Sequence, residues 1–416
     1  MATETIGTGE TYTTIQSWED SLGVSLLSEP EIGECKGENF SESPTFSGPS
    51  TSATNYMLLK PVSGYEHDGR ANAVSGKGNA RITVTGNVTI QTSYFRMQFM
   101  EVLSSGTSAG DARVRINASA VGVYLNHNII HNDGGSTNSG NNGILLSDSG
   151  CQAYVYRNII YGMGASGIDI SKCTSGTVVY NNTVFDCNTG SDASEGGIRC
   201  ADSDCTLKNN VAVGNDTADF VISAGTVDYN ASSDSSATGT NSVTGVDLGH
   251  FRNATTTYAS TDLRRGAFNG DVLTDAALYI TAVSLSSTFD IDIEGDETVG
   301  DWDLGADNFT ASDFPVVQGI YQASRPIHVG GSLYNMWADN DGLFSESDSG
   351  PIIADPGGFQ PPDFVRPRPA SFIMSTRSYA MERAPFLGFI HRLIIPLPSG
   401  STPWYYRMVT TRRRKS

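Results

Sequence analysis

The sequence has no long apolar run, and this absence argues against a helical membrane protein. None of its apolar segments approaches the roughly 20 residues that a membrane-crossing helix needs. The first residues also lack the basic and apolar regions of a signal peptide, so we expect no export by the usual secretory route. The periodic patterns of helical bundles and of alternating strands and helices are missing as well. What remains is a protein built mainly from β-structure.

Cysteine is scarce, and no two cysteines have the CxxC spacing of a typical zinc site. Five of the six fall inside the repeats described below. We expect small, half-buried residues that stack between neighbouring repeats, while disulfides between repeats stay open as an alternative. The six are Cys35, Cys151, Cys173, Cys187, Cys200 and Cys205.

What the sequence does have is one short phrase written four times between residues 124 and 215: LNHNIIHN, VYRNIIYG, VYNNTVFD and LKNNVAVG. The copies share an asparagine, at Asn128, Asn158, Asn182 and Asn210. A second phrase lies upstream of each copy, and its apolar anchors are Val114, Ile144, Ile168 and Ile198. Both series advance together at intervals of 24 to 30 residues, which is typical of a solenoid.

The repeat length predicts a parallel β-helix. One coil of about three short strands and their turns takes roughly 20 to 30 residues, and successive coils stack about 4.8 Å apart. Equivalent asparagines then lie above one another and can form a ladder of side-chain amide hydrogen bonds. We expect this ladder to extend to Asn230 and, in the other direction, to Gln98.

The N-terminal residues predict a short helix from about Thr13 to Leu22, with Gly23 ending it. Laid over the first coil, such a helix would cover the open end of the solenoid. The glycine-rich lead, the phrase YTTIQ and this helix resemble the entry to right-handed β-helix proteins of the pectin-lyase-like superfamily, which includes many phage tailspikes and virion proteins. The resemblance covers roughly residues 5–310 and implies the fold more specifically than the function.

Residues 288–309, TFDIDIEGDETVGDWDLGADNF, resemble the acidic, glycine-turned phrase that closes many β-helix repeat proteins. We expect a solvated acidic cap at the end of the solenoid. A calcium site is the alternative, with Asp290, Asp292 and Asp296 as ligands, because Ca²⁺ prefers carboxylate oxygens. No other cofactor is indicated.

The last part of the chain reverses the charge. The whole protein has a net charge of -19, but residues 360–416 hold ten Lys and Arg against two acids, a net of +8 that leaves -27 for the rest. This asymmetry predicts an attachment arm for an acidic partner. A nucleic acid is not favoured, because RRRK alone offers few phosphate contacts. The residues expected to bind the partner are Arg366, Arg368, Arg392, Trp404, Tyr405, Arg412, Arg413, Arg414 and Lys415.

Catalytic residues are hard to find in the repeats. Members of the superfamily often cleave polysaccharides with paired carboxylates or a basic residue, and the candidates here are Asp169, Glu195 and Asp202. Their neighbours on adjacent coils alternate in charge, which favours exposed ion pairs over an active site. His127 is expected at the surface and His131 in a packing position, rather than together as a metal pair.

The sequence therefore predicts an all-β protein with a helical N-terminal cap in residues 1–30, a right-handed parallel β-helix in 31–310 and an irregular, proline-rich C-terminal attachment arm in 311–416. The expected function is structural: a phage protein on the virion surface, either decorating the capsid or part of a tail fibre or spike, bound to other virion proteins. It would be a homo-oligomer, with a trimer as one arrangement. A polysaccharide lyase or hydrolase and a non-catalytic glycan-binding adhesin are the alternatives.

Overall fold

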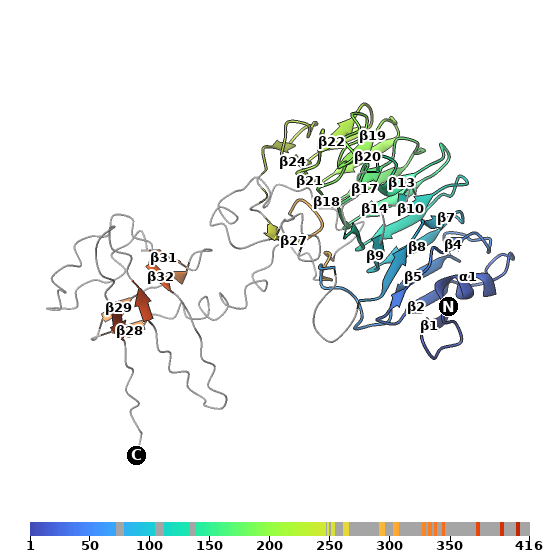
Figure 1. Ribbon diagram of the computed structural model, residues 1–416, viewed down its shortest axis with the longest axis horizontal. Coiled ribbons are helices and arrows are strands. Elements are labelled where there is room, and N and C mark those ends of the chain that lie inside the picture. The colour runs from blue at the N-terminus through green and yellow to red at the C-terminus, as the bar shows by residue number, and fades with distance from the viewer. Residues whose placement is uncertain are drawn as a thin grey trace, which may run out of the picture. The chain divides into compact units, whose positions relative to one another are not determined.

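The computed structural model describes residues 1–71, 79–104, 112–133, 138–246 and 248, the segments 251–253, 261–265, 291–295 and 303–307, and short strands between 327 and 407. The chain divides into two compact units. The first contains Met1–Gly266 and Thr274–Phe309, and the second contains Ala267–Leu273 and Thr310–Ser416. Three parallel sheets build the first unit (Figure 1).

Sheet A holds nine strands, and each pairs in parallel with the strand of the next coil. They are β1 (Ala2–Ile6), β2 (Glu31–Cys35), β5 (Met57–Pro61), β8 (Phe95–Gln98), β11 (Val123–Asn126), β14 (Ala153–Tyr156), β17 (Thr177–Tyr180), β20 (Cys205–Lys208) and β23 (Thr226–Asp228). Side chains alternate along each strand, so that in β14 Ala153 and Val155 face the core while Tyr154 and Tyr156 face outward.

Sheets B and C complete each coil, in that order along the chain. Sheet B contains β3 (Asn39–Phe40), β6 (Arg81–Val84), β9 (Glu101–Ser104), β12 (Ile129–Asn132), β15 (Ile159–Tyr161), β18 (Thr183–Phe185), β21 (Val211–Val213), β24 (Ala231–Ser232) and β25 (Val243–Thr244). Sheet C contains β4 (Thr45–Phe46), β7 (Val88–Ile90), β10 (Ala112–Ile116), β13 (Asn142–Leu146), β16 (Ile168–Asp169), β19 (Ile198–Cys200) and β22 (Phe220–Ile222). The parallel β-helix expected from the repeats is confirmed.

The register of sheet C aligns the four apolar anchors in one buried column, where Val114 pairs with Ile144, Ile144 with Ile168 and Ile168 with Ile198. Residues of all three sheets fill the interior of the coils as one apolar core. An apolar residue recurs at the equivalent position of each coil. A single coil therefore needs the coils on either side of it to bury its apolar side chains.

The asparagine ladder lies at the turn between sheets A and B. Each amide Nδ2 donates to the Oδ1 of the next asparagine at 2.9 or 3.0 Å, from Asn128 through Asn158, Asn182 and Asn210 to Asn230. The same Oδ1 accepts the backbone N–H of the asparagine before it. The residue preceding each asparagine is left-handed, with φ between 49° and 58°. The ladder therefore supplies hydrogen-bond partners to the backbone N–H groups of a sharp turn.

The expected extension of the ladder to Gln98 is wrong. Gln98 pairs with Asn126, two residues before the ladder position, and lies on the outer face of sheet A. Its place is taken by Met100, whose backbone N–H donates to Asn128 Oδ1 at 3.0 Å. At the other end, Ser242 Oγ accepts from the backbone N–H of Asn230 at 3.1 Å. A backbone donor and a hydroxyl thus end the ladder.

Helix α1 (Ile15–Ser21) covers the first coil, as expected. Thr14 caps its N-terminus by accepting from Ser17 N–H at 3.1 Å, and Gly23 follows its C-cap with φ +67°. Ile15 and Trp18 are fully buried. A Cβ at Gly33 of β2 would come within 3.0 Å of the Trp18 ring, so the helix can lie this close only over a glycine.

Four of the cysteines match the expectation of small core residues. Four cysteines are buried with free thiols, namely Cys35, Cys151, Cys173 and Cys187. The backbones of Cys151 and Cys173 pair as an isolated parallel β-bridge between adjacent coils. The remaining two form a disulfide, Cys200–Cys205, that lies within one coil rather than between coils. The strand β19 and the start of β20 are thereby joined across a single turn.

The acidic phrase near residue 300 lies along the flank of the solenoid. We call its described residues, 291–295 and 303–307, the returning segment. Ile293, Leu304 and Ala306 pack on apolar side chains that sheet B turns outward, namely Ile129, Ile159, Tyr161, Phe185, Val211 and Val213. Asp292, Asp303 and Asp307 are at most 3% exposed. The expectation of a solvated cap is wrong for these three carboxylates.

Hydrogen bonds fix the returning segment to the coils. Arg157 Nη1 donates to the carbonyl oxygens of Gly305 and Ala306, at 3.3 and 3.1 Å. Ala306 N–H donates to Thr183 Oγ1 at 2.9 Å. Gly305 has φ +94°, and a Cβ there would come within 2.8 Å of Thr183 Oγ1, so glycine is required. The apolar outer face of sheet B is buried as a result.

Antiparallel strands form the rest of the described structure. In the first unit β26 (Phe251–Asn253) pairs with β27 (Asp262–Arg265). In the second unit β28 (Ile327–Val329) pairs with β29 (Ser332–Tyr334), and a five-stranded sheet contains β30 (Trp337–Ala338), β31 (Leu343–Ser345), β32 (Phe372–Met374), β33 (Arg392–Ile394) and β34 (Tyr405–Arg407). These strands add regular structure to a region for which the sequence predicts none. The proline-rich strap of residues 351–369 lies outside the described residues.

Candidate functional site

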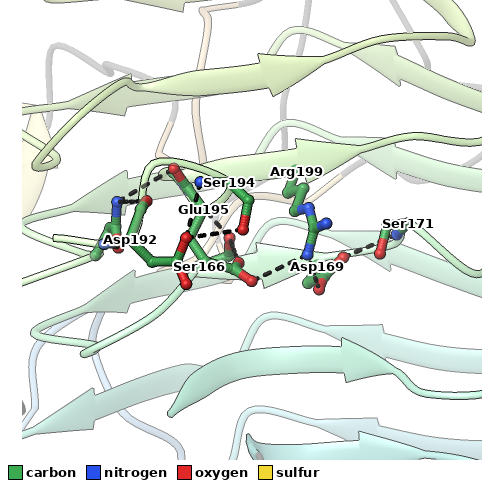
Figure 2. A network of polar contacts seen from close by, with 9 residues as sticks. Ser166, Asp169, Ser171, Asp192, Ser194, Glu195 and Arg199 are labelled. Carbon is green, nitrogen blue, oxygen red and sulfur yellow. Dashed lines mark hydrogen bonds and ion pairs between the residues drawn. The ribbon is translucent and has the colours of Figure 1, made fainter. Parts of the chain in front are cut away.

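Two of the three catalytic candidates meet on sheet C (Figure 2). Asp169 on β16 and Arg199 on β19 are register neighbours, and Glu195 lies four residues before Arg199. Arg199 Nη1 donates to Glu195 Oε1 at 2.9 Å and to Asp169 Oδ2 at 3.2 Å. Asp202 is not part of this group, because its Oδ1 accepts the N–H of Asp204 in a separate turn.

The other oxygens of the two carboxylates are also occupied. Ser166 donates its hydroxyl hydrogen to Glu195 Oε2 and accepts from Gly196 N–H at 3.2 Å, while Asp169 Oδ1 accepts Ser171 N–H at 2.8 Å. Burial raises the pKa of Glu195, and the hydrogen bond from Ser166 opposes that change. Both carboxylates are under 10% exposed. The arrangement is an internally satisfied ion-pair cluster, so the expected exposure of these charges is wrong.

A second charged cluster, on sheet B, was not predicted. Glu101 on β9 is fully buried, and its Oε1 lies 2.9 Å from both Arg81 Nε and His131 Nε2. Its Oε2 accepts from Asn79 Nδ2 at 2.9 Å. Burial alone would raise the pKa of Glu101, but His131, Arg81 and Asn79 lower it to about 2. The sequence signal is one acidic residue within an apolar strand, in the phrase FMEVL.

His131 packs as expected, with its ring stacked on that of Tyr161 at a centroid distance of 5.0 Å. Its two ring nitrogens also contact two carboxylates. Nε2 faces Glu101 and Nδ1 lies 2.9 Å from Asp133 Oδ1. Burial disfavours the charged ring, yet the two carboxylates outweigh burial and raise the pKa of His131. The cluster stabilises the early coils and leaves Glu101 no free oxygen for chemistry.

His127 is buried, which corrects its expected surface position. Nε2 donates to the carbonyl oxygen of Ile291 at 3.1 Å, and the ring stacks on Phe99 at 4.7 Å. His67 Nε2 donates to the carbonyl oxygen of His127 at 2.8 Å, while its Nδ1 accepts from Gly69 N–H. The two histidines therefore connect the loop after β5, the ladder turn and the returning segment. Among the described residues, neither belongs to a group of side chains that could hold a metal ion.

The proposed metal ligands are only partly described. Asp292 is buried, and its Oδ1 accepts from Glu294 N–H at 3.0 Å, whereas Asp290 and Asp296 lie outside the described residues. In the part of the chain that the structure describes, no three His, Cys, Asp or Glu side chains gather as a metal site would require. Of the partner-binding residues, Arg392 begins β33 and Tyr405 begins β34, and the others also lie outside the described residues.

A stripe of tyrosines on the outer face of sheet A was missed by the sequence analysis. Tyr124 and Tyr154 are register neighbours whose rings stack at 4.4 Å and 9°. Tyr156 and Tyr180 pair in the next column of the same face, and all four pack together. The signal is tyrosine recurring two or four residues before the ladder asparagine. We call these four side chains the tyrosine stripe.

Arg96 on β8 extends the tyrosine stripe toward the N-terminus. Its guanidinium carbon lies 3.5 Å from the centroid of the Tyr56 ring and 5.1 Å from that of Tyr124. Its Nε is buried, and no hydrogen bond or ion pair joins Arg96 to any residue that the structure describes. Within the same limits the hydroxyls of Tyr124, Tyr154 and Tyr180 have no protein partner.

Burial keeps Tyr124, Tyr156 and Tyr180 protonated. It raises the pKa of Tyr156 to about 12, and it raises the pKa of Tyr124 and of Tyr180, with the neighbouring Tyr154 adding to the effect at Tyr124. At neutral pH each hydroxyl can therefore both donate and accept a hydrogen bond. Because the rings are stacked or packed against one another, their positions are fixed before any ligand arrives.

Comparisons with known proteins give little beyond the fold. No model of a known protein family matches the chain, and no curated protein matches it. Among solved structures, the chain is similar to the deglycosylated pectin methylesterase of Aspergillus niger, with 14% identity over 62% of this chain and 94% of that one and a TM-score of 0.36. No helix among the described residues is long and apolar enough to cross a membrane. The pairing of its own strands makes this chain a parallel β-helix.

Proposed function

We propose that the protein binds a glycan on the outer face of sheet A and does not cleave it. One observation carries the proposal: on this face a guanidinium and three phenol hydroxyls are held in place with no partner among the described residues. The carboxylate clusters of sheets B and C, in contrast, are bonded to other side chains. Polar groups that are fixed but unpaired are available to a ligand.

The chemistry of the tyrosine stripe favours a hydroxyl-rich polymer. One face of Tyr124 and one face of Tyr154 cover each other, so these two faces cannot stack on a sugar ring. Their edges and hydroxyls remain, and hydroxyls that donate and accept are suited to the hydroxyls of a carbohydrate. Successive strands lie about 4.8 Å apart, so an extended chain that follows the solenoid axis meets one coil after another.

Cleavage is disfavoured by the state of the carboxylates. Glycoside hydrolysis needs two carboxyl groups on either side of the scissile bond, one of them free to attack or to activate water. Asp169 and Glu195 instead share one guanidinium group, and both are nearly buried. A substrate would have to displace Arg199 before either carboxylate could react.

Replacing Tyr124 and Tyr154 together with phenylalanine is expected to weaken glycan binding at least tenfold. The change removes two hydrogen-bonding hydroxyls, each worth about 1 kcal/mol, and keeps the stacked rings. Binding is measured on a glycan array and then by titration calorimetry with the best ligand. Tyr65→Phe, which removes a hydroxyl from an exposed loop after β5, is the matched control.

Unchanged affinity in the double variant would refute the proposed binding face. Products from the bound glycan would instead support the enzyme alternative, in particular if Glu195→Gln abolished them. With the proposal correct, the glycan is recovered at its original length, with no new reducing ends or unsaturated products.

We further propose that residues 311–416 attach the β-helix to a larger assembly, and that this assembly is the surface of a phage virion. The charge of +8 in residues 360–416, against -27 elsewhere, supports an acidic docking partner or the acidic body of a neighbouring copy. A chain ending at residue 309, where the first unit ends, is expected to fold and to bind glycan but to be lost from purified virions. Retention of the shortened chain at the level of the full chain would exclude the arm as the attachment.

A further inference from the structure

Resting on the proposed glycan face, we infer that its ligand is anionic and that Arg96 is the residue that selects the charge. The inference names a chemical class, a polymer that carries carboxylate, sulfate or phosphate groups along a carbohydrate backbone. It depends on where the positive charges of this face lie and on what surrounds them.

Arg96 differs from the cations of the described coils that form ion pairs. Lys36 pairs with Glu10, Lys60 with Glu34 and Arg70 with Asp68, while Arg81 and Arg199 each contact a buried carboxylate. Arg96 touches the rings of Tyr56 and Tyr124 instead, and none of the described carboxylates approaches it. In a protein of net charge -19, a half-buried cation without an acidic neighbour marks a place for an anion from outside.

The two tyrosines fix the guanidinium group in a defined orientation. The guanidinium carbon lies over the Tyr56 ring, 3.5 Å from its centroid and close enough for a strong cation–π contact, and 5.1 Å from the centroid of Tyr124. A planar guanidinium held in this way can present two parallel N–H groups to a carboxylate, sulfate or phosphate. A lysine at this position would keep the charge but lose the planar pair of donors.

A second cation ends the tyrosine stripe on the other side. Lys208 on β20 is the register neighbour of Tyr180 on one side and of Asp228 on the other, and no ion pair joins it to Asp228. Between β8, which carries Arg96, and β20 lie β11, β14 and β17, so the two charges are separated by four strand spacings, about 19 Å. A linear polymer with repeated anionic groups can reach both while its hydroxyls meet the phenols between them.

The test compares charged and neutral forms of one polymer on the full-length protein. The probes are alginate and carboxyl-reduced alginate, with dextran sulfate and dextran as a second pair that separates sulfate from carboxylate recognition. The wild-type protein is expected to bind the charged member at least 30-fold more tightly at low salt, and the preference should shrink as salt is raised. Arg96→Gln should lose most of the preference, with only the part that Lys208 supplies remaining. Arg96→Lys should keep part of the preference.

Lys60→Gln is the matched control, since Lys60 lies on the same sheet but is already paired with Glu34. Thermal melts of each variant establish that it is folded. The inference is overturned if Arg96→Gln keeps the wild-type preference, or if the wild-type protein binds charged and neutral members equally. In both cases a loss of affinity in the Tyr124→Phe/Tyr154→Phe variant would leave the proposed function standing. If the wild-type protein binds no member of either pair, both the inference and the glycan face are rejected.

Discussion

Asn158→Ala is expected to lower the free energy of unfolding by about 3–5 kcal/mol. Asn158 Oδ1 accepts from both the backbone N–H and the side-chain amide of Asn128, and Nδ2 donates to the carbonyl oxygen of Leu125 and to Asn182 Oδ1. All of these atoms are buried, so alanine leaves several groups without a partner, and each costs about 1–3 kcal/mol. The loss occurs in the middle of the ladder, where water cannot replace the missing amide.

Urea unfolding monitored by circular dichroism measures the effect. Asn39→Ala is the matched control, because Asn39 is exposed on β3, where its side chain accepts from Thr83 Oγ1 and donates to Ser41 Oγ. A surface change of this kind costs about 0.5 kcal/mol. If both variants lose the same small amount, the ladder is not a main source of stability. A lower slope of the transition for Asn158→Ala would show that the coils no longer unfold together.

Acidification from pH 6.5 to pH 4 is expected to reduce stability by about 3 kcal/mol through His127 alone. Burial lowers the pKa of His127 to about 3, and although its bond to Ile291 raises the pKa, Arg157 and His67 lower it further. The same ring in the unfolded chain titrates near 6.5. Between these two pKa values His127 is protonated in the unfolded state and neutral in the folded state. The free energy of unfolding therefore falls as the pH falls.

His127→Gln isolates this contribution. Glutamine can still donate to the carbonyl oxygen of Ile291 but has no proton to take up, so the variant should lose less stability than the wild type between pH 6.5 and 4. Carboxylates such as Glu101, whose pKa is lowered to about 2, contribute equally to both proteins and cancel in the comparison. Identical pH profiles for the two proteins would show that His127 is not the group responsible. His131, whose pKa is raised, should act oppositely and lose its stabilising effect at high pH.

The repeats carry the fold in a form that can be read from sequence, because each coil places the same residue type at the same turn. Asn128, Asn158, Asn182 and Asn210 could be aligned without any structure, and their register is the observed one. Gln98 has the side-chain amide of a ladder residue but lies two positions before the ladder site. Met100 occupies the ladder site there, and a main-chain donor needs no particular side chain.

The rest depends on contacts between distant parts of the chain. The column of His127, Arg157 and Asn181 is polar and precedes the ladder, so sequence alone places it at the surface. It is buried because the returning segment, which begins 110 positions after Asn181, covers it. The buried aspartates of that segment were misjudged for the same reason. The tyrosine stripe was within reach of the sequence, since outward positions alternate with the core residues of sheet A.

The returning segment also determines when, during synthesis, the outer face of sheet B becomes covered. Ala306 leaves the ribosome 95 residues after Val211, the side chain whose outer face it helps to cover. At about 5–20 residues per second, the apolar flank of sheet B stands uncovered for roughly 5 to 20 s while the intervening chain is made. During that interval the coils are complete but their apolar outer face on sheet B is exposed, so two nascent chains can associate through this face. Slower translation of residues 212–306 therefore lengthens the time during which this apolar flank is exposed.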